Sequence, residues 1–573
     1  MPMSFVVPRI AIYRVVFFLL LCIGFSTQPI LAVEDVNNKF GIHLAQPQDE
    51  DIDRATQLVN SAGGNWGYIT LVIQEDDRKL DKWQAIFEKL REQNLIPIIR
   101  LATTPEGKNW KRPKIKDADQ WVDFLNSLHW VVKNRYIILF NEPNHATEWG
   151  GKVDSESFAK VNKEFAQKLK AKDEDFFVMM AGMDASAPQS KPAYMDERIF
   201  LQEVIDEIGA DNFNKFFDGL SSHSYPNPGF SGSPYSSGRG TIRTYDWELS
   251  LLSSLGVKSL PVFITETGWN GDVLSRAQIA EHFRYAYQNV WIPDDRVIAV
   301  TPFVLNYQGE PFLKFSWVKE GNEGENPEFE TVKAMEKIKG MPEIRQKGIF
   351  DLSDLPHDII EQSTYHFRIQ IKNEGQAIWS RENGYDFMLE NIKPSQYLVS
   401  SFGQIKPFET KSIDIYFSTL NALGEFDTRL VLYRDEDKVL ESNFWNYEVV
   451  SLPSLILNIS LFPKYTTDDN EFELQMFNKY EELVFRKSGI HVTDGQGSIE
   501  KVDNIVLGRQ YRVVLIKKHY LPRQTFVAFQ KDKNQIAFDP MIPLDFDEDG
   551  ALGWGDILAL FQNLKLMKLW WVW

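Results

Sequence analysis

The sequence predicts an α/β fold in which eight strand–helix units close into a (β/α)8 TIM barrel. Short, continuously apolar runs alternate with longer amphipathic runs from residue 39 to about residue 340, and this unit repeats eight times. Eight units in about 300 residues match the size of such a barrel. Continuously apolar strands between helices indicate a parallel sheet covered on its outer face. An open, doubly wound sheet is the alternative, although no Gly-rich phosphate loop follows the first strand.

The eight strands of the barrel are predicted from their apolar runs, and amphipathic stretches such as residues 79–94, 117–134 and 275–290 are the intervening helices. In this fold the functional residues lie at the C-terminal ends of the strands. The predicted strands are residues 39–45, 66–73, 96–102, 136–144, 176–184, 217–226, 260–269 and 297–306.

After the barrel the pattern changes to short alternating strands separated by turn residues, which predicts two small all-β sandwich domains. A short EF-hand-like calcium segment follows them. The predicted boundaries are 33–342 for the barrel, 345–452 and 453–540 for the two sandwiches, and 541–564 for the calcium loop and its helix.

Composition limits the classes of partner. The chain has 573 residues, 43% of them hydrophobic, which is enough for several packed cores. Its formal net charge of −18 argues against a nucleic-acid partner, because phosphate backbones need clustered Lys and Arg.

Residues 1–32 read as an export signal, with Arg9 and Arg14 ahead of an apolar run that reaches Phe25. The chain is therefore expected to be secreted or attached to a bacterial-type cell surface. The cleavage site is ambiguous because Ile30 is a poor small residue, so an uncleaved membrane anchor is the alternative. The only cysteine, Cys22, lies inside this segment, so the mature chain is expected to have no disulfide.

Two glutamates end predicted strands in turn-forming settings. Glu142 follows strand four and Glu266 follows strand seven. A carboxylate that ends a buried strand is costly unless it is hydrogen-bonded or used. Facing glutamates at a barrel mouth meet the requirement of a glycosidase for one group that protonates the leaving oxygen and one that attacks the anomeric carbon. The alternative is structural: Glu142 lies in a capped turn, and Glu266 pairs with Arg100 at the end of strand three.

The motifs Asn141-Glu142-Pro143, His223-Ser224-Tyr225 and Thr265-Glu266-Thr267-Gly268-Trp269 follow strands four, six and seven. In this order they resemble the clan of retaining barrel glycosidases that have catalytic glutamates on strands four and seven. The resemblance covers residues 39 to about 340.

The resemblance implies a role for each of these side chains. Glu142 is the acid/base and Glu266 the nucleophile. Asn141 binds the sugar 2-hydroxyl, Tyr225 holds Glu266, and His223 lines the same site. Retention requires carboxyl groups about 5 to 5.5 Å apart rather than the roughly 6.5 to 9.5 Å of inverting enzymes. It also requires a protonated Glu142, whose pKa the Glu266 carboxylate is expected to raise.

Three indoles near strand ends, those of Trp149, Trp269 and Trp317, are candidates for stacking on sugar rings, although each alone is more often a core residue. Trp269 and Trp317 are predicted to bind substrate together with Arg100. Many members of the clan carry a tryptophan near the end of strand eight, where this chain has Leu305-Asn306-Tyr307. His43, at the end of strand one, is interpreted as structural.

The sandwich segments carry their own resemblances. Residues 373–379 and 432–435 resemble the tryptophan-containing immunoglobulin-like domain found in an autophagy receptor and in bacterial extracellular enzymes. This resemblance implies a role in spacing or adhesion. The segment 453–540, with the sequence KKHYLPRQ at residues 517–524, resembles a carboxypeptidase regulatory domain.

A 12-residue acidic loop predicts a structural calcium site. Carboxylates occupy its positions 1, 3, 5 and 12, Gly550 occupies position 6, and position 7 offers a backbone carbonyl. The aspartate at position 12 resembles the loop of dockerins, which anchor enzymes to cohesin partners. Dockerins carry two such loops and this sequence shows one; a solvated acidic turn is the alternative. The predicted ligands are Asp545, Asp547, Asp549, Ala551 and Asp556.

The sequence thus predicts a retaining glycosidase that cleaves O-glycosidic, β-type linkages in a polysaccharide or oligosaccharide, with no catalytic cofactor. A catalytically inactive carbohydrate-binding barrel and a cell-surface adhesin that uses the β modules are the competing hypotheses. Specificity is expected to lie in loops such as residues 227–240, and the sequence does not name the sugar.

Overall fold

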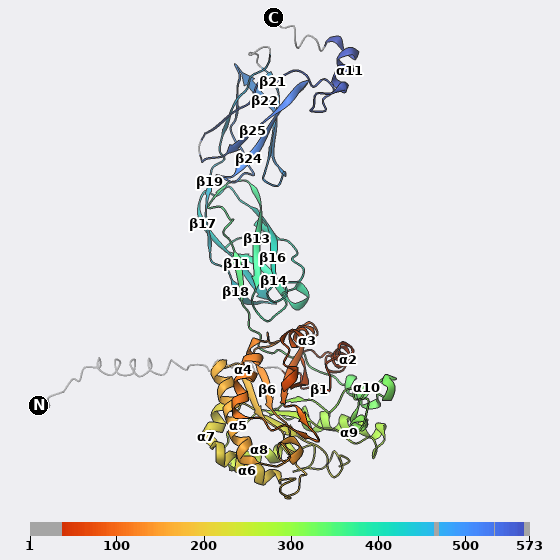
Figure 1. The fold of residues 1–573 in the computed structure, drawn as a ribbon. Coiled ribbons are helices and arrows are strands. Elements are labelled where there is room, and N and C mark those ends of the chain that lie inside the picture. The colour runs from red at the N-terminus through yellow and green to blue at the C-terminus, as the bar shows by residue number, and fades with distance from the viewer. Residues whose placement is uncertain (1–36, 463–468, 532, 566–573) are drawn as a thin grey trace, which may run out of the picture. The chain divides into compact units, whose positions relative to one another are not determined.

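The computed structural model describes residues 37–462, 469–531 and 533–565, which divide into two compact units with the boundary between Glu343 and Ile344 (Figure 1). The predicted export signal and the apolar tail from residue 566 lie outside the described residues. Within the described ranges, none of the helices combines the length and the apolar composition that crossing a membrane requires.

The first unit is a closed ring of parallel strands. Hydrogen bonds join the strands in the orders β1-β2-β3-β6-β7 and β10-β9-β8, and single parallel bridges at Phe40–Val300 and Met179–Gly219 connect the two sheets. This closure confirms the predicted barrel and excludes the open sheet. The strands are β1 Gly41–Leu44, β2 Gly67–Gln74, β3 Leu95–Ala102, β6 Arg135–Leu139, β7 Phe176–Met180, β8 Leu220–His223, β9 Val262–Glu266 and β10 Val297–Val300.

Helices follow each strand and surround the ring (Figure 1). Side chains cap three of them at the N-terminus: Asp154 for α5, Asp196 for α6 and Ser275 for α9. These caps accept backbone N–H groups that would otherwise lack a partner. The helices are α2 Asp49–Val59, α3 Leu80–Glu92, α4 Ala118–Ser127, α5 Ser155–Lys172, α6 Glu197–Ile208, α7 Ala210–Phe216, α8 Thr244–Ser254, α9 Arg276–Ala286 and α10 Pro327–Lys333.

The side chains inside the barrel form layers along its axis, with aromatic rings at the N-terminal end and polar groups towards the C-terminal end. Rings from the second residue of four strands, Tyr68, Tyr136, Phe177 and Phe263, pack with centroids 5.0 to 6.3 Å apart and fill the N-terminal end. A layer of hydroxyls lies above them, with Thr70 bonded to Thr301 at 2.8 Å and Ser221 to Thr265 at 2.7 Å. The carboxylates therefore lie at the C-terminal mouth.

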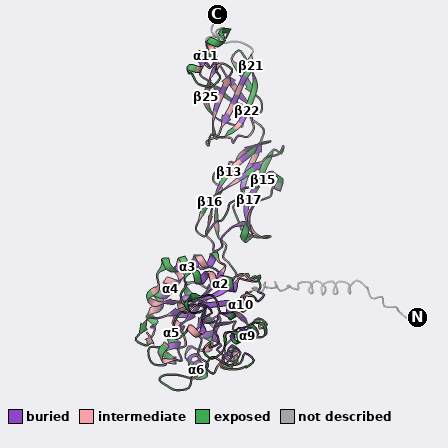
Figure 2. Cartoon of the chain, turned by 90° about the vertical axis from the view of Figure 1, so that its right-hand side faces the viewer, coloured by how far each residue is buried: buried purple, intermediate pink, exposed green. Residues whose placement is uncertain are grey.

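In the second unit, residues 348–450 form two sheets that share one apolar core (Figure 2). The indole of Trp379 is fully buried in this core, and its Nε1 donates to Gln346 at 3.2 Å. One sheet has the order β11 Gly348–Asp351, β13 Thr364–Asn373, β16 Thr410–Ser418, β15 Tyr397–Val399. The other has β12 Asp358–Ile360, β19 Trp445–Val450, β17 Gly424–Arg434 and β14 Tyr385–Glu390, with β18 Asp437–Glu441 paired to β17.

The following strands are hydrogen-bonded into one continuous sheet, and residues from both of its halves share one apolar core. Asp494 and Gly495, with φ angles of 51° and 76°, form a two-residue turn that pairs β22 with β23 and joins the two halves into a single seven-stranded sheet around one core. Helix α11, Trp554–Gln562, follows the acidic loop. The strands are β20 Leu455–Asn458, β21 Asp469–Phe477, β22 Leu483–Thr493, β23 Gln496–Ile499, β24 Gln510–Lys517, β25 Tyr520–Ala528 and β26 Asn534–Ala537.

Candidate active site

The turn after β6 holds Glu142 in an unusual backbone conformation. Phe140 and Glu142 have φ angles of 74° and 28°, which non-glycine residues rarely adopt. The Phe140 ring is buried against Trp149 at 5.7 Å and Phe165 at 5.4 Å, so core packing supports the turn. Positive φ angles of this kind cluster at functional sites, where the surrounding structure compensates their cost.

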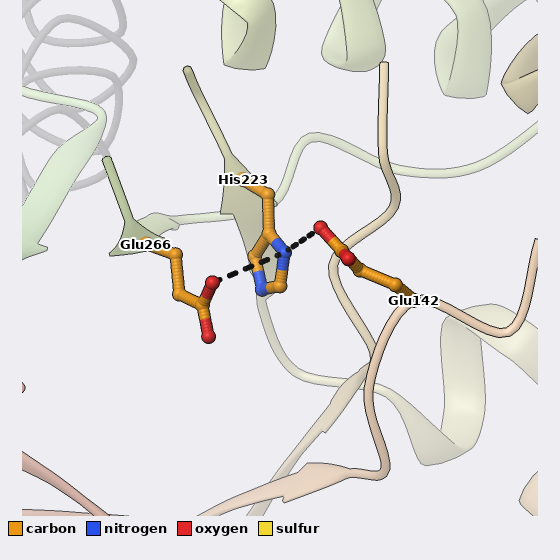
Figure 3. Close-up of side chains that lie close together, drawn as sticks. All are labelled: Glu142, His223 and Glu266. Atoms are coloured by element: carbon orange, nitrogen blue, oxygen red, sulfur yellow. Dashed lines mark hydrogen bonds and ion pairs between the residues drawn. The ribbon is translucent and has the colours of Figure 1, made fainter. Parts of the chain in front are cut away.

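His223, the last residue of β8, lies between the two glutamates (Figure 3). Its Nδ1 is 2.8 Å from Oε1 of Glu142 and 3.8 Å from Oε2 of Glu266. One oxygen of each carboxylate and the ring nitrogen lie within 4.8 Å of one another. The imidazole therefore contacts one carboxylate directly and lies close to the second.

Glu266, the last residue of β9, is held by two further groups. Nη1 of Arg100 donates to its Oε1, and the Tyr225 hydroxyl donates to its Oε2 at 3.1 Å. Nη1 of Arg100 also donates to Oδ1 of Asn141 at 2.8 Å. The structure thus brings together six residues predicted from the sequence: Arg100, Asn141, Glu142, His223, Tyr225 and Glu266. The ion pair of the structural hypothesis is present, and it lies inside this cluster.

The electrostatics of the cluster favour an ionised Glu266. Burial opposes its charge, but the neighbouring His223 and Arg100 outweigh burial and lower the pKa of Glu266 to about 2. Burial, reinforced by the Glu266 charge, raises the pKa of Tyr225 well above its ordinary value of 10.0, so its hydroxyl remains a donor. Burial acts to lower the pKa of His223, but Glu266 and Glu142 raise it above 6.5.

Gly182, just after β7, makes room for the imidazole. A Cβ at this position would lie 2.2 Å from Cδ2 of His223, closer than any real contact. The Gly182 carbonyl also accepts the backbone N–H of Glu142 at 3.2 Å. A glycine is therefore required for steric reasons where the chain after β7 meets His223 and Glu142.

A third carboxyl group, which the sequence analysis missed, belongs to the site. Glu148 ends the short 3-10 turn Ala146–Glu148. Burial and the nearby charge of Glu142 raise its pKa to about 7, against a hydrogen bond from Asn141 that favours the charged form. The only sequence signal was its position six residues after Glu142 in the same loop. Its neighbour His145 pairs with Asp184 at 2.7 Å.

His43, at the end of β1, is 1% exposed and packs against Phe303 with centroids 5.1 Å apart. Among the residues that the structure describes, neither of its ring nitrogens has a hydrogen-bond partner. Burial and the charge of Arg100 lower its pKa to about 3, so the ring is neutral. Phe303 supplies an aromatic ring just after β10, at the barrel mouth beside His43.

Two predicted substrate-binding residues are corrected. Trp269 and Trp317 are each 1% exposed, so neither presents an open ring face for a sugar. The chain after β9 turns towards α9, where Trp269 packs on Phe283 at 4.9 Å and its Nε1 donates to the Gly232 carbonyl at 2.9 Å. Trp317 packs on the same Phe283 ring, at 4.8 Å. Both indoles, like the fully buried Trp149, are core residues.

The predicted specificity loop, residues 227–240, packs against residues of the site. Phe230, with φ of 58°, packs on Tyr225 at 4.9 Å and on Phe315 at 5.3 Å. The backbone N–H of Asn270 donates to the Phe230 carbonyl at 2.9 Å. Because Tyr225 holds Glu266, this loop contacts the support of a catalytic candidate directly.

The acidic loop of the second unit brings together three of its predicted ligands. Asp545, Asp547 and Asp549 each place one carboxylate oxygen within 4.8 Å of the others. Asp545 is 5% exposed, and its Oδ1 has no hydrogen-bond partner within the described part of the chain. The Asp556 carboxylate accepts the N–H groups of Phe546 at 2.7 Å and Gly553 at 2.6 Å, so it closes the loop. The Ala551 N–H donates to Asp549 at 2.8 Å.

Comparisons with known proteins give only distant similarities. No family model matches the chain, and no curated protein matches it. Solved structures that resemble it include an FMN-binding β-glucuronidase from Facaelibacterium prausnitzii, with 10% identity and a TM-score of 0.33 over 73% of this chain and 58% of that chain. This chain therefore spans less than two thirds of the length of the glucuronidase.

Two other similar structures are matched over nearly their whole length. A triple mutant of an endo-β-1,4-glucanase from Xanthomonas axonopodis pv. citri has 12% identity and a TM-score of 0.35 over 52% of this chain and 98% of that chain. A glucosidase from Croceicoccus marinus has 10% identity and a TM-score of 0.40 over 85% and 97%. Similarities of this size assign no activity, so the activity is inferred from the residues of this chain.

Proposed function

We propose that this chain is a retaining glycoside hydrolase that cleaves β-type O-glycosidic bonds. The observation that carries the proposal is the pair of glutamates at the barrel mouth, with one oxygen of each within 4.8 Å of the other. A closest approach below 4.8 Å fits the separation of about 5 to 5.5 Å between the carboxyl groups of retaining enzymes, in which one carboxylate attacks directly.

In the first step Glu142 donates a proton to the glycosidic oxygen, the bond between this oxygen and the anomeric carbon breaks, and Glu266 forms a covalent ester with the anomeric carbon. In the second step Glu142 takes a proton from water, the water oxygen attacks the anomeric carbon, and Glu266 leaves. The low pKa of Glu266, about 2, supports its assignment as the nucleophile. The Tyr225 hydroxyl engages Oε2 of Glu266, and Arg100 engages Oε1.

Replacement of the nucleophile tests this assignment. The wild-type protein is expected to hydrolyse at least one of a panel of aryl β-glycosides, and Glu266→Gly to lose about three orders of magnitude or more in kcat. Azide restores turnover in Glu266→Gly and yields a glycosyl azide of inverted configuration, because azide enters the space left by the carboxylate. Glu266→Gln is the matched control, since its side chain still fills that space.

Failure of the wild-type protein on every sugar, together with no glycosyl adduct in a mass spectrum, contradicts catalysis. It favours the inactive sugar-binding barrel or the adhesin. The predicted export, the polysaccharide or oligosaccharide substrate, and a cohesin or cell-surface partner for the C-terminal modules belong to the same proposal.

We also propose that the loop from Asp545 to Asp556 holds one structural calcium ion. Calcium prefers oxygen ligands, and the buried, unpartnered Oδ1 of Asp545 fits a cation ligand better than a solvated acidic turn. Asp547 and Asp549 would complete the carboxylate side of the site.

Calcium at about one hundred times its Kd adds about 2.7 kcal/mol to the stability of the state that binds it. EDTA is therefore expected to lower the melting temperature of the second unit by several degrees, and Asp545→Asn to abolish this response. Asp539→Asn, an exposed aspartate outside the loop, is the control. A wild-type melting temperature that EDTA leaves unchanged refutes the site.

A further inference from the structure

The second unit contains a cavity of about 630 Å³ between the β13 side of its first part and the strands β24 and β25 of its second. Its walls are joined by direct bonds: the Thr364 N–H donates to Oδ1 of Asn504 at 2.7 Å, and the Asn504 N–H donates to the Ser363 hydroxyl at 2.9 Å. A bridge between Ile359 and Val506 adds a backbone connection. The cavity is therefore formed without a ligand, and its size is typical of small-ligand sites.

Exposed aromatic rings line this cavity. Tyr480 is 54% exposed and Phe526 is 55% exposed. His366 also lines it and stacks in parallel on Tyr416, with centroids 4.8 Å apart and planes 6° apart. Aromatic faces attract the C–H faces of a ring-shaped ligand, and Tyr adds a polar hydroxyl. An apolar ligand alone would not use the polar groups beside these rings.

The charges that line the cavity cancel. Three cations, Lys479, Arg509 and Arg512, face three carboxylates, those of Asp354, Glu481 and Glu482. Two of these carboxylates are already fixed: Nε of Arg512 donates to Glu481 at 3.1 Å, and Asn478 donates to Glu482 at 2.7 Å. In a chain with a net charge of −18, this balance favours a neutral ligand rather than an anionic or a cationic one.

We propose that this cavity is a non-catalytic binding site for a neutral glycan chain. Exposed rings next to oriented amide, carboxylate and guanidinium groups match a ligand that has apolar ring faces and many hydroxyls. This proposal depends on the proposed function in one respect: a glycan bound in the cavity is brought to the barrel as its substrate. The residues that carry it are separate from those of the barrel.

The test uses the full-length chain with Glu266→Gln, which prevents digestion of the probe. Binding to cellulose, β-mannan, β-1,4-galactan, polygalacturonate and chitosan is measured by depletion or by affinity electrophoresis. At least one neutral polymer is expected to bind, and Tyr480→Ala and Phe526→Ala each to weaken this binding about tenfold. Phe444→Ala is the matched control, because Phe444 is 45% exposed and is not a lining residue.

The proposal is overturned by the absence of binding to any neutral polymer, by binding to charged polymers alone, or by equal binding of the cavity variants and the control at unchanged melting temperature. Selective capture of a peptide by the cavity overturns it as well. Hydrolysis of a small aryl glycoside by Tyr480→Ala, without Glu266→Gln, is expected to match wild type. If wild type lacks hydrolysis but shows Tyr480-dependent binding, the catalytic proposal fails and the binding site stands.

Discussion

Replacing Arg100 by methionine removes a positive charge from the side chain that faces Oε1 of Glu266. The pKa of Glu266 is about 2, compared with an ordinary value of 4.5. This lowering corresponds to about 3 kcal/mol in favour of the charged form, although burial acts against that charge. Among the neighbours that lower this pKa, His223 comes first and Arg100 next, so removal of the Arg100 charge is expected to weaken the preference for the charged form by on the order of 1 kcal/mol.

The sign of the expected change in activity follows from the role of Glu266. A nucleophile reacts in its ionised form, so activity falls as the pH drops through its pKa. In Arg100→Met the pKa rises by about one unit or more, because burial is no longer offset by that cation. The acid limb of kcat/KM against pH is therefore expected to move to higher pH by about one unit.

The pH dependence of the folding stability tests the charge of Glu266 without a substrate. The folded-state pKa of Glu266 lies below its unfolded value, so its contribution is present above about pH 4.5 and is lost as the pH falls towards 2. In Arg100→Met this contribution shrinks, and the melting temperature depends less on pH in that window. Calorimetry between pH 2 and 7 measures this change.

Arg100→Lys is the control for charge, because it keeps the cation and loses the planar fork. It is expected to retain an acid limb close to wild type, with a lower kcat. If Arg100→Met reduces kcat but leaves the acid limb and the pH dependence of melting unchanged, Arg100 does not maintain the charge of Glu266. The reasoning from the geometry is then wrong.

Three further substitutions test other parts of the site. Gly182→Ala places a Cβ 2.2 Å from Cδ2 of His223, so a loss of about 1 to 3 kcal/mol in stability and a large drop in kcat are expected, measured by melting and by kinetics. The raised pKa of Glu148, about 7, means that the folded state keeps a proton that the unfolded state releases, so the stability of the wild type falls as the pH rises from 4.5 to 7. In Glu148→Gln this fall in stability is expected to disappear. Trp269→Phe loses its hydrogen bond to Gly232, which costs about 1 kcal/mol by denaturant unfolding, and KM is expected to stay within about twofold because the ring does not contact substrate.

Each of these substitutions has a control or an outcome that contradicts it. Gly309→Ala has open space around the new Cβ and is expected to be silent. A Glu148→Gln variant that keeps the wild-type pH dependence of melting shows that another group titrates there. A KM increase of tenfold or more in Trp269→Phe shows that the indole of Trp269 contacts the sugar.

The barrel and its glutamates were accessible from the sequence because their signals are local. All eight predicted strands are present, and each catalytic candidate lies at or just after a strand end, where the parallel topology gathers such residues. Helix length was predicted less well. The predicted helix 117–134 ends at Ser127, because the following segment turns to bury Trp130 against Phe87 at 5.2 Å.

The features that the sequence did not predict depend on tertiary structure, which a local sequence pattern does not contain. Sequence position gave no indication that Trp269 turns outward to α9, since this depends on how the chain leaves β9 after Gly268, which has a φ of 156°. The sequence position of Glu148 likewise did not indicate its high pKa, which depends on burial and on a carboxylate six residues away. The single sheet of the last β segment followed from one Asp-Gly turn, which the strand pattern alone did not connect to the sheet order.

The contact between Phe230 and Tyr225 has a consequence for engineering and for evolution. In many barrel enzymes a surface loop is exchanged to change the substrate while the catalytic groups stay fixed. Here the loop that is expected to choose the sugar packs on Tyr225, whose hydroxyl donates to Glu266. A graft of this loop that omits Phe230 would shift the reactivity of Glu266 together with the substrate preference.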